Sequence, residues 1–184
     1  MTSAFTRLAS PWLVRGAVLT LLSLAGCMQA EKTADLAAAD AKATMTAQNS
    51  PTLSMAEVQE GQVVQRQARR PAVRQLDARM VTEHGMVNDQ LMALAREKKI
   101  TPPVAPNDYK KNELGELKTM KGSAFDKAGL DAQVVDHQEV LRLYQMEAEQ
   151  GTDPDVKAFT AHHAPTIEHH LEMVQKLGGH TPNS

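Results

Sequence analysis

The sequence predicts an all-α protein, an antiparallel bundle of four main helices with additional short helices. Three observations lead to this prediction. Apolar residues recur every three or four positions along several long segments, which is the period of a helix with one buried face. Most of these segments begin at a capping residue or a proline and end near a glycine or proline. No segment shows the alternation of apolar and polar residues that is typical of a strand.

The first main helix is predicted after a polar N-terminal region. Residues 28–49 are rich in Ala, Thr and Asp and form either a tether or a helical extension. Asn49-Ser50-Pro51 has the composition of a helix breaker. Ser54 and Glu57 are spaced as a capping box, so we expect a helix to begin there and to continue to about Arg69.

The second main helix has the most regular apolar face. It is expected to begin at Pro71, a residue favoured in the first helical turn, and to end at Lys98-Lys99 before the loop 101–106. Successive face residues are 4, 4, 3, 4 and 3 positions apart, which is helical spacing throughout. They are Leu76, Met80, His84, Val87, Leu91 and Leu94.

A shorter amphipathic segment that ends at Gly122 precedes the third main helix. Ser123 and Asp126 are spaced as its cap, and Gly151 is expected to end it. Its predicted face consists of Leu130, Val134, His137, Leu141, Tyr144 and Ala148.

The fourth main helix is predicted to begin at Asp153-Pro154 and to end at Gly178-Gly179. Its face consists of Val156, Phe159, His163, Ile167, His170, Val174 and Leu177. The loops are short or moderate, which favours antiparallel neighbours.

The N-terminus has the pattern of an export signal. Arg7 and Arg15 accompany an apolar run, Gly16–Gly26, that ends in small residues and is shorter than the roughly 20 residues needed to span a bilayer. Leu24-Ala25-Gly26-Cys27 resembles the lipobox of bacterial lipoproteins, and Cys27 is the only cysteine in the chain. The resemblance implies that Cys27 is lipidated and anchors the protein to a membrane. A plain secretory signal with an incidental Cys27 is the alternative.

We therefore predict a signal peptide over residues 1–26, a lipidated N-terminus with a tether or helical extension over 27–50, and the bundle domain over 51–180. Met28 stands where Asp tends to retain lipoproteins of Gram-negative bacteria in the inner membrane. It favours the periplasmic face of the outer membrane.

Composition excludes several classes of function. The 20 basic and 22 acidic residues give a formal charge of −2, and aromatic residues make up 3%, which argues against nucleic-acid binding. A single cysteine excludes a disulfide framework. The chain has no nucleophile motif and no glycine-rich phosphate loop, so we predict no catalytic residue and favour a non-enzymatic protein.

Three of the seven histidines fall on the apolar faces of three different helices: His84, His137 and His170. One interpretation is that they are core histidines with hydrogen-bond partners. The other is that they converge on a mononuclear metal site with Glu57 or Glu60, where imidazoles and one carboxylate would suit zinc, copper or iron.

A conventional di-iron site is not expected, because none of the histidines has a glutamate three residues before it. Glu83 and Asp136 each precede a face histidine and do not point at it, because adjacent residues on a helix diverge. Each acid is instead a candidate for orienting a histidine of another helix.

Several motifs resemble a bacterial family of unknown function, often labelled predicted outer-membrane protein and placed among ferritin-like helical bundles. The resemblance covers about residues 35–178. It rests on Glu57-Val58-x-x-Gly61, Arg79-Met80-Val81-x-Glu83-His84, Phe125-Asp126, Asp136-His137-Gln138, Asp153-Pro154 and Pro165-x-x-x-x-His170-Leu171. It implies a helical bundle in the cell envelope and no particular reaction.

These observations leave two main hypotheses, with a plain structural spacer as a third. The first is a lipid-anchored, periplasm-facing bundle that acts as a binding or envelope-stress module for an unknown protein or small molecule. The second is a metal-binding bundle that uses histidines from several helices.

Overall fold

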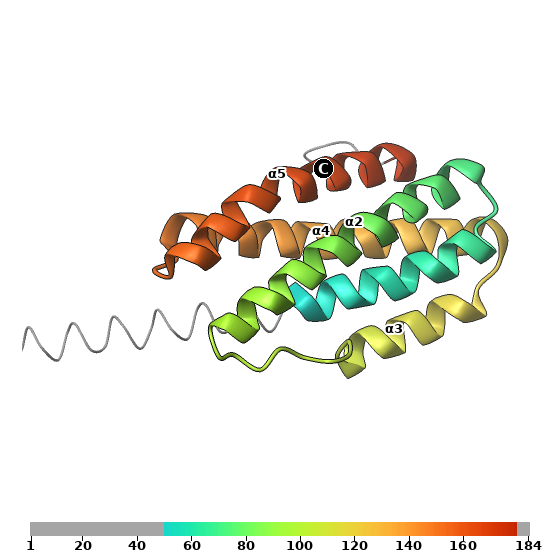
Figure 1. Ribbon diagram of the computed structural model, residues 1–184. Helices are drawn as coiled ribbons and strands as arrows, with labels where there is room; N and C mark the ends of the chain where they lie inside the picture. Colours follow the sequence, from blue (N-terminus) through green and yellow to red (C-terminus); the bar gives the residue numbers. More distant parts are fainter. Residues whose placement is uncertain (1–49, 180–184) are drawn as a thin grey trace, which may run out of the picture. The chain divides into compact units, whose positions relative to one another are not determined.

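The computed structural model describes residues 50–179, and every regular element within that range is an α-helix (Figure 1). The first described helix covers residues 50–67. It is followed by α2 (Pro71–Glu97), α3 (Asp108–Thr119), α4 (Gly122–Gln150) and α5 (Pro154–Gly178). The all-α prediction is confirmed. The predicted signal peptide, Cys27 and His180 lie outside the described residues.

The long helices form an antiparallel bundle, with the shorter α3 along one side (Figure 1). Each helix runs opposite to the one before it. The helix α4 packs along α5, α2 also contacts α5, and α3 contacts α4. This arrangement brings one face of each long helix to a common interior.

Most predicted helix ends are confirmed. Pro71 occupies the first turn of α2. The Asp153 side chain caps α5 by accepting hydrogen bonds from the backbone N–H groups of Asp155 and Val156. Gly179 ends α5 in the left-handed conformation, with φ of 75°, which glycine adopts without the steric cost of a Cβ.

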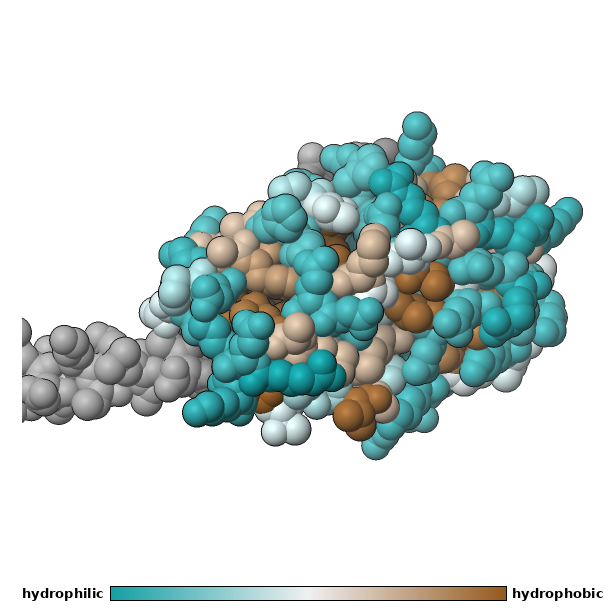
Figure 2. All heavy atoms as spheres, viewed as in Figure 1, coloured by the Kyte–Doolittle hydropathy of each residue, from teal (hydrophilic) through white to brown (hydrophobic). Residues whose placement is uncertain are grey.

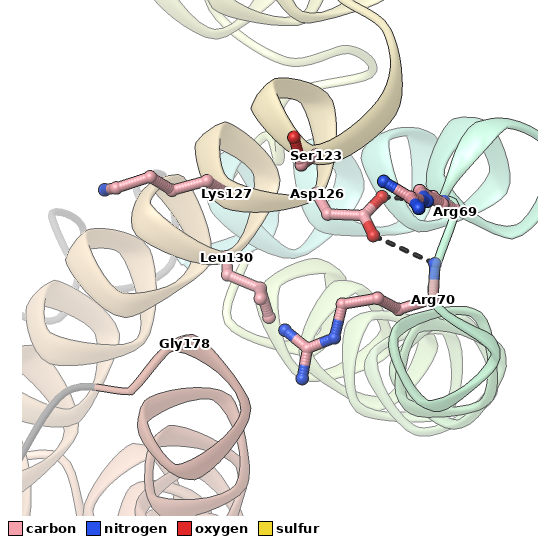
Figure 3. A pocket seen from close by; sticks show the side chains of 7 residues that line it. All are labelled: Arg69, Arg70, Ser123, Asp126, Lys127, Leu130 and Gly178. Atoms are coloured by element: carbon pink, nitrogen blue, oxygen red, sulfur yellow. Dashed lines mark hydrogen bonds between the residues drawn. The ribbon is translucent and has the colours of Figure 1, made fainter.

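Two predicted caps are wrong. Ser54 and Glu57 lie inside a helix that already includes Ser50 and Pro51, so neither the break nor the capping box is found there. Asp126 does not cap its own helix. Its carboxylate oxygens accept hydrogen bonds from the backbone N–H groups of Arg69, at 2.8 Å, and Arg70, at 2.9 Å (Figure 3). Asp126 thus satisfies the amides of the turn that leads into α2.

The interior contains two apolar clusters. The larger includes Met80, Phe125 and Val174, and the smaller is formed by Val140, Tyr144 and Ile167. On α4 the predicted face is displaced near its end: Leu141 and Ala148 are half-buried, whereas Leu143 and Glu147 are buried.

The face shown in Figure 2 is mainly hydrophilic, with small separate groups of hydrophobic side chains. None of the described helices has the length and apolarity needed to cross a membrane.

Candidate metal centre

Four buried polar side chains from four helices meet in the interior of the bundle. They are Glu57 from the first described helix, His84 from α2, His137 from α4 and His170 from α5. Their exposed fractions are 3%, 1%, 0% and 1%. One ring nitrogen from each histidine lies within 4.8 Å of the other two. We call these four residues the histidine–glutamate centre.

The contacts of this centre converge on one ring nitrogen. His84 Nε2 lies 2.6 Å from Glu57 Oε2, 3.2 Å from His137 Nε2 and 3.3 Å from His170 Nδ1. A ring nitrogen carries at most one hydrogen, so it cannot form hydrogen bonds with three such neighbours at once. Hydrogen bonds among these side chains therefore cannot account for all three short contacts of His84 Nε2.

The Glu57 carboxylate lies close to two histidine rings but makes no hydrogen bond of acceptable geometry with them. Oε1 lies 3.5 Å from His137 Nδ1, in addition to the contact of Oε2 with His84. Neither oxygen makes a hydrogen bond of acceptable geometry with another described residue. A buried carboxylate in this condition is costly unless a further group, such as a cation, completes its contacts.

Two of the three histidines are held by acceptors on their outer side. His137 Nδ1 lies 2.8 Å from the backbone oxygen of Gln133, one turn earlier on α4. His170 Nε2 contacts the carboxylate of Glu83 on α2. A proton on His137 Nδ1 and on His170 Nε2, shared with these acceptors, would leave a lone pair on His137 Nε2 and on His170 Nδ1, the arrangement that is usual for metal-binding histidines. Glu83 thus contacts a histidine of another helix, which is the arrangement that its predicted orienting role requires.

The electrostatics of the centre differ between its carboxylate and its rings. Burial alone would raise the Glu57 pKa, but the positive charge that His137, His84 and His170 carry when protonated, together with the His84 contact, lowers it to about 2. Burial lowers the pKa of His137, and it lowers that of His170 to about 4 despite the Glu83 contact. At neutral pH these two imidazoles are neutral, so their lone pairs are available for a cation next to a negative charge.

Close packing of the first helix against α2 helps to place Glu57. Gly61 lies one turn after Glu57, and a Cβ at this position would be 2.8 Å from Val81 Cγ2. A larger residue would push the two helices apart. The glycine therefore allows the carboxylate from one helix to reach the imidazole from the other.

A second group of polar side chains is buried beside the centre. Glu60, Asp77 and Asp136 are each at most 6% exposed. Burial raises the pKa of Asp77 and of Asp136 to about 7, and that of Glu60 well above its usual range, in each case together with neighbouring carboxylates. We call these three residues the buried acids.

Asp136, the other acid predicted to orient a histidine, contacts Lys110 Nζ from α3. The short helix α3 lies along α4 and brings this buried ammonium group to the Asp136 carboxyl group. The orienting role of Asp136 stays a prediction.

A family model covers most of the chain, residues 26–177, under the description Domain of unknown function (DUF4142). The chain belongs to this family. The resemblance drawn from the sequence motifs is thereby confirmed, and the family description names no activity. Comparison with curated proteins gives no match.

A solved structure shares the fold of this family member. It is the crystal structure of a conserved hypothetical protein from Mycobacterium tuberculosis, with a TM-score of 0.60 and 16% identity. The alignment covers 82% of this chain and 96% of that chain. At this identity the likeness supports the helical bundle and carries no information on ligands.

The remaining described histidines do not join the centre. His163 Nε2 lies 3.2 Å from Gln90 Oε1, and its ring packs 4.4 Å from that of Phe159. His162 and His169 are exposed on α5. Asp77 was not among the residues predicted from the sequence, although it lies seven residues before His84 and therefore on the same face of α2.

Proposed function

We propose that this protein binds one divalent transition-metal ion at the histidine–glutamate centre, with His84, His137, His170 and Glu57 as ligands. The observation that carries the proposal is the convergence of three imidazole nitrogens and one carboxylate, from four helices, in a buried place. A tetrahedral ion with metal–nitrogen bonds of about 2.0–2.1 Å separates its nitrogen ligands by about 3.3 Å. The distances from His84 Nε2 to the other two histidines, 3.2 and 3.3 Å, are close to that separation, whereas the 2.6 Å contact of Glu57 Oε2 with His84 Nε2 is shorter and would lengthen around an ion.

The donor set narrows the choice of ion. Three imidazoles with one carboxylate suit zinc, copper and iron better than calcium or magnesium, which prefer oxygen ligands. Four protein ligands close a tetrahedral site, and a closed site is typical of a stabilising or stored ion and not of a catalytic one. The proposal therefore describes a metal-binding bundle and assigns no catalytic residue.

The test is metal analysis combined with thermal melting of the full chain. After treatment with EDTA, addition of zinc, copper or ferrous ion should give one bound ion per chain for the preferred metal. An ion at 100 times its Kd stabilises the folded state by about 2.7 kcal/mol, or about 5–10 °C in Tm for a chain of this size.

Variants separate this proposal from ordinary core histidines. His84→Ala, His137→Ala, His170→Ala and Glu57→Gln should each lose the stoichiometric ion, whereas His169→Ala, at an exposed position on α5, should keep it. If chelator changes nothing and each buried replacement only costs about 1–3 kcal/mol, the histidines are structural.

We further propose that Cys27 is lipidated and holds the bundle at the periplasmic face of the outer membrane. The support is the position of the only cysteine directly after Leu24-Ala25-Gly26. Fractionation with labelled palmitate is the test. Wild-type protein should take up label and remain with membranes, and Cys27→Ser should lose both properties. Unlabelled wild-type protein would contradict the anchor and leave the metal proposal untouched.

A further inference from the structure

A concave feature lies on the side of the bundle that α3 covers. It is a pocket of about 340 Å³ whose lining residues include four acids and no basic residue. Three of the acids, Glu113, Glu116 and Asp131, come from α3 and α4 and are at least partly exposed. The fourth is Glu60, which reaches the pocket from the first helix.

Glu60 distinguishes this pocket from an ordinary acidic surface. It is only 6% exposed, and its Oε1 atom has no hydrogen-bond partner among the described residues. Lysines contact Glu113 and Asp131 of the rim, but no ion pair of Glu60 occurs within residues 50–179. A buried carboxyl oxygen without a hydrogen-bond partner is costly, and a cation in the pocket would supply the missing contact.

The position of Glu60 also relates the pocket to the histidine–glutamate centre. Glu60 is three residues after Glu57, so the two carboxyl groups are neighbours on one helix face. Near them lie Asp77 and Asp136, and Lys110 is the cation that contacts this group. Among the described residues, four buried acids thus lie close to one buried ammonium, and a cation bound at Glu60 would take the place of the proton that burial favours there.

We propose that the pocket between α3 and α4 is a second cation site, at Glu60, where a divalent metal ion binds before it moves to the histidine–glutamate centre. The transfer of the ion to the histidine–glutamate centre rests on the proposed function, whereas the cation site at Glu60 does not. Glu116, the rim acid with no lysine contact among the described residues, attracts the ion, Glu60 binds it, and Glu57 receives it about one turn earlier on the same helix. An acidic cleft of this kind raises the local concentration of cations and the rate of association.

The cation site is tested with manganese, because Mn²⁺ prefers oxygen ligands. Full chain already loaded with zinc is titrated with Mn²⁺, and free Mn²⁺ is followed by electron paramagnetic resonance. Wild-type protein should bind one Mn²⁺, and Glu60→Gln should not. Glu168→Gln, at an exposed position on α5, is the matched control and should bind like wild type. Absence of Mn²⁺ binding to wild type, or binding that survives Glu60→Gln, overturns the second site.

The access role is tested by the rate of cobalt uptake into metal-free full chain, followed through the visible absorption of the Co²⁺-imidazole complex. Glu60→Gln should slow uptake by about tenfold or more and leave the final absorption unchanged. Uptake at the wild-type rate overturns the access role. If wild type itself develops no such absorption, the proposed function fails, and the manganese titration still decides the second site. Because the Glu60 pKa is raised, glutamine resembles the protonated side chain, and circular dichroism should confirm a folded variant.

Discussion

Removal of the Glu83 carboxylate should weaken metal binding without touching a ligand. Glu83 holds the outer nitrogen of His170 and is itself held by Arg79, whose Nε lies 2.7 Å from Glu83 Oε1. Loss of a group that orients a metal-binding histidine typically costs 10–100-fold in affinity, or about 1.4–2.7 kcal/mol. The Glu83 side chain is 25% exposed, so water replaces part of what is lost. We therefore expect Glu83→Gln, which keeps an acceptor oxygen, to raise the Kd about tenfold, and Glu83→Ala to raise it further.

The assay is competition with a chromophoric chelator for zinc at pH 7.5. Arg79→Gln, which leaves Glu83 in place, should change the Kd by less than about threefold, because an exposed ion pair contributes little. Glu139→Gln removes an exposed, arginine-paired carboxylate on α4 and controls for the loss of charge. Unchanged affinity in both Glu83 variants, or an equal loss in Glu139→Gln, would show that Glu83 does not orient a ligand.

Three other predictions concern stability in the absence of metal. Leu91→Ala should cost about 2–5 kcal/mol in urea unfolding because Leu91 is 1% exposed, and the half-buried Leu141→Ala should cost less; equal losses would contradict the observed α4 face. Asp126→Asn should cost about 2–3 kcal/mol, because one of the two backbone N–H groups would face an NH2 group and lose its acceptor, while the other would keep only a neutral one. A thermal melt equal to that of wild type would rule this out. Burial raises the Asp77 pKa from 3.8 to about 7, so the protonated Asp77 side chain contributes fully to stability below pH 3.8 and this contribution is lost as pH rises through 7. The free energy of unfolding should fall by up to about 1.4 kcal/mol per pH unit in this range. Asp77→Asn should reduce this pH dependence, and equal slopes of unfolding free energy against pH for the two proteins would refute the prediction.

Periodicity accounts for what could be predicted of the fold and of the centre. Helical spacing assigns His84, His137 and His170 to the buried sides of three helices, and an antiparallel bundle directs those sides to one interior. The structure places all three together, with Glu57 beside them. Spacing alone could not predict that the three histidines lie at the same height along the bundle axis. That height depends on loop lengths and on how closely the first described helix approaches α2 at Gly61.

The features that sequence analysis missed depend on contacts between distant segments. Asp126 accepts hydrogen bonds from residues 56 and 57 positions earlier, so its local spacing to Ser123 suggested the wrong partner. Lys110 lies on α3, whose weak apolar pattern says little about its packing, yet it is 7% exposed and pairs with Asp136. On α4, the face turns slowly over 29 residues, because 3.6 residues per turn do not repeat after seven. Leu143 therefore takes the buried position that a strict 3–4 pattern gave to Leu141.

The position of the centre explains how metal binding and stability would be linked. On α4, His137 lies between Val134 of the larger apolar cluster and Val140 of the smaller one, and on α5, His170 lies between Val174 and Ile167 in the same way. The centre is thus a polar layer between two apolar clusters, where burial of charge opposes folding. An ion bound by one ligand from each of four helices would stabilise only the state in which all four are assembled. The free energy of metal binding would then offset the cost of burying this polar layer. The same four buried side chains would therefore both destabilise the metal-free protein and bind the ion.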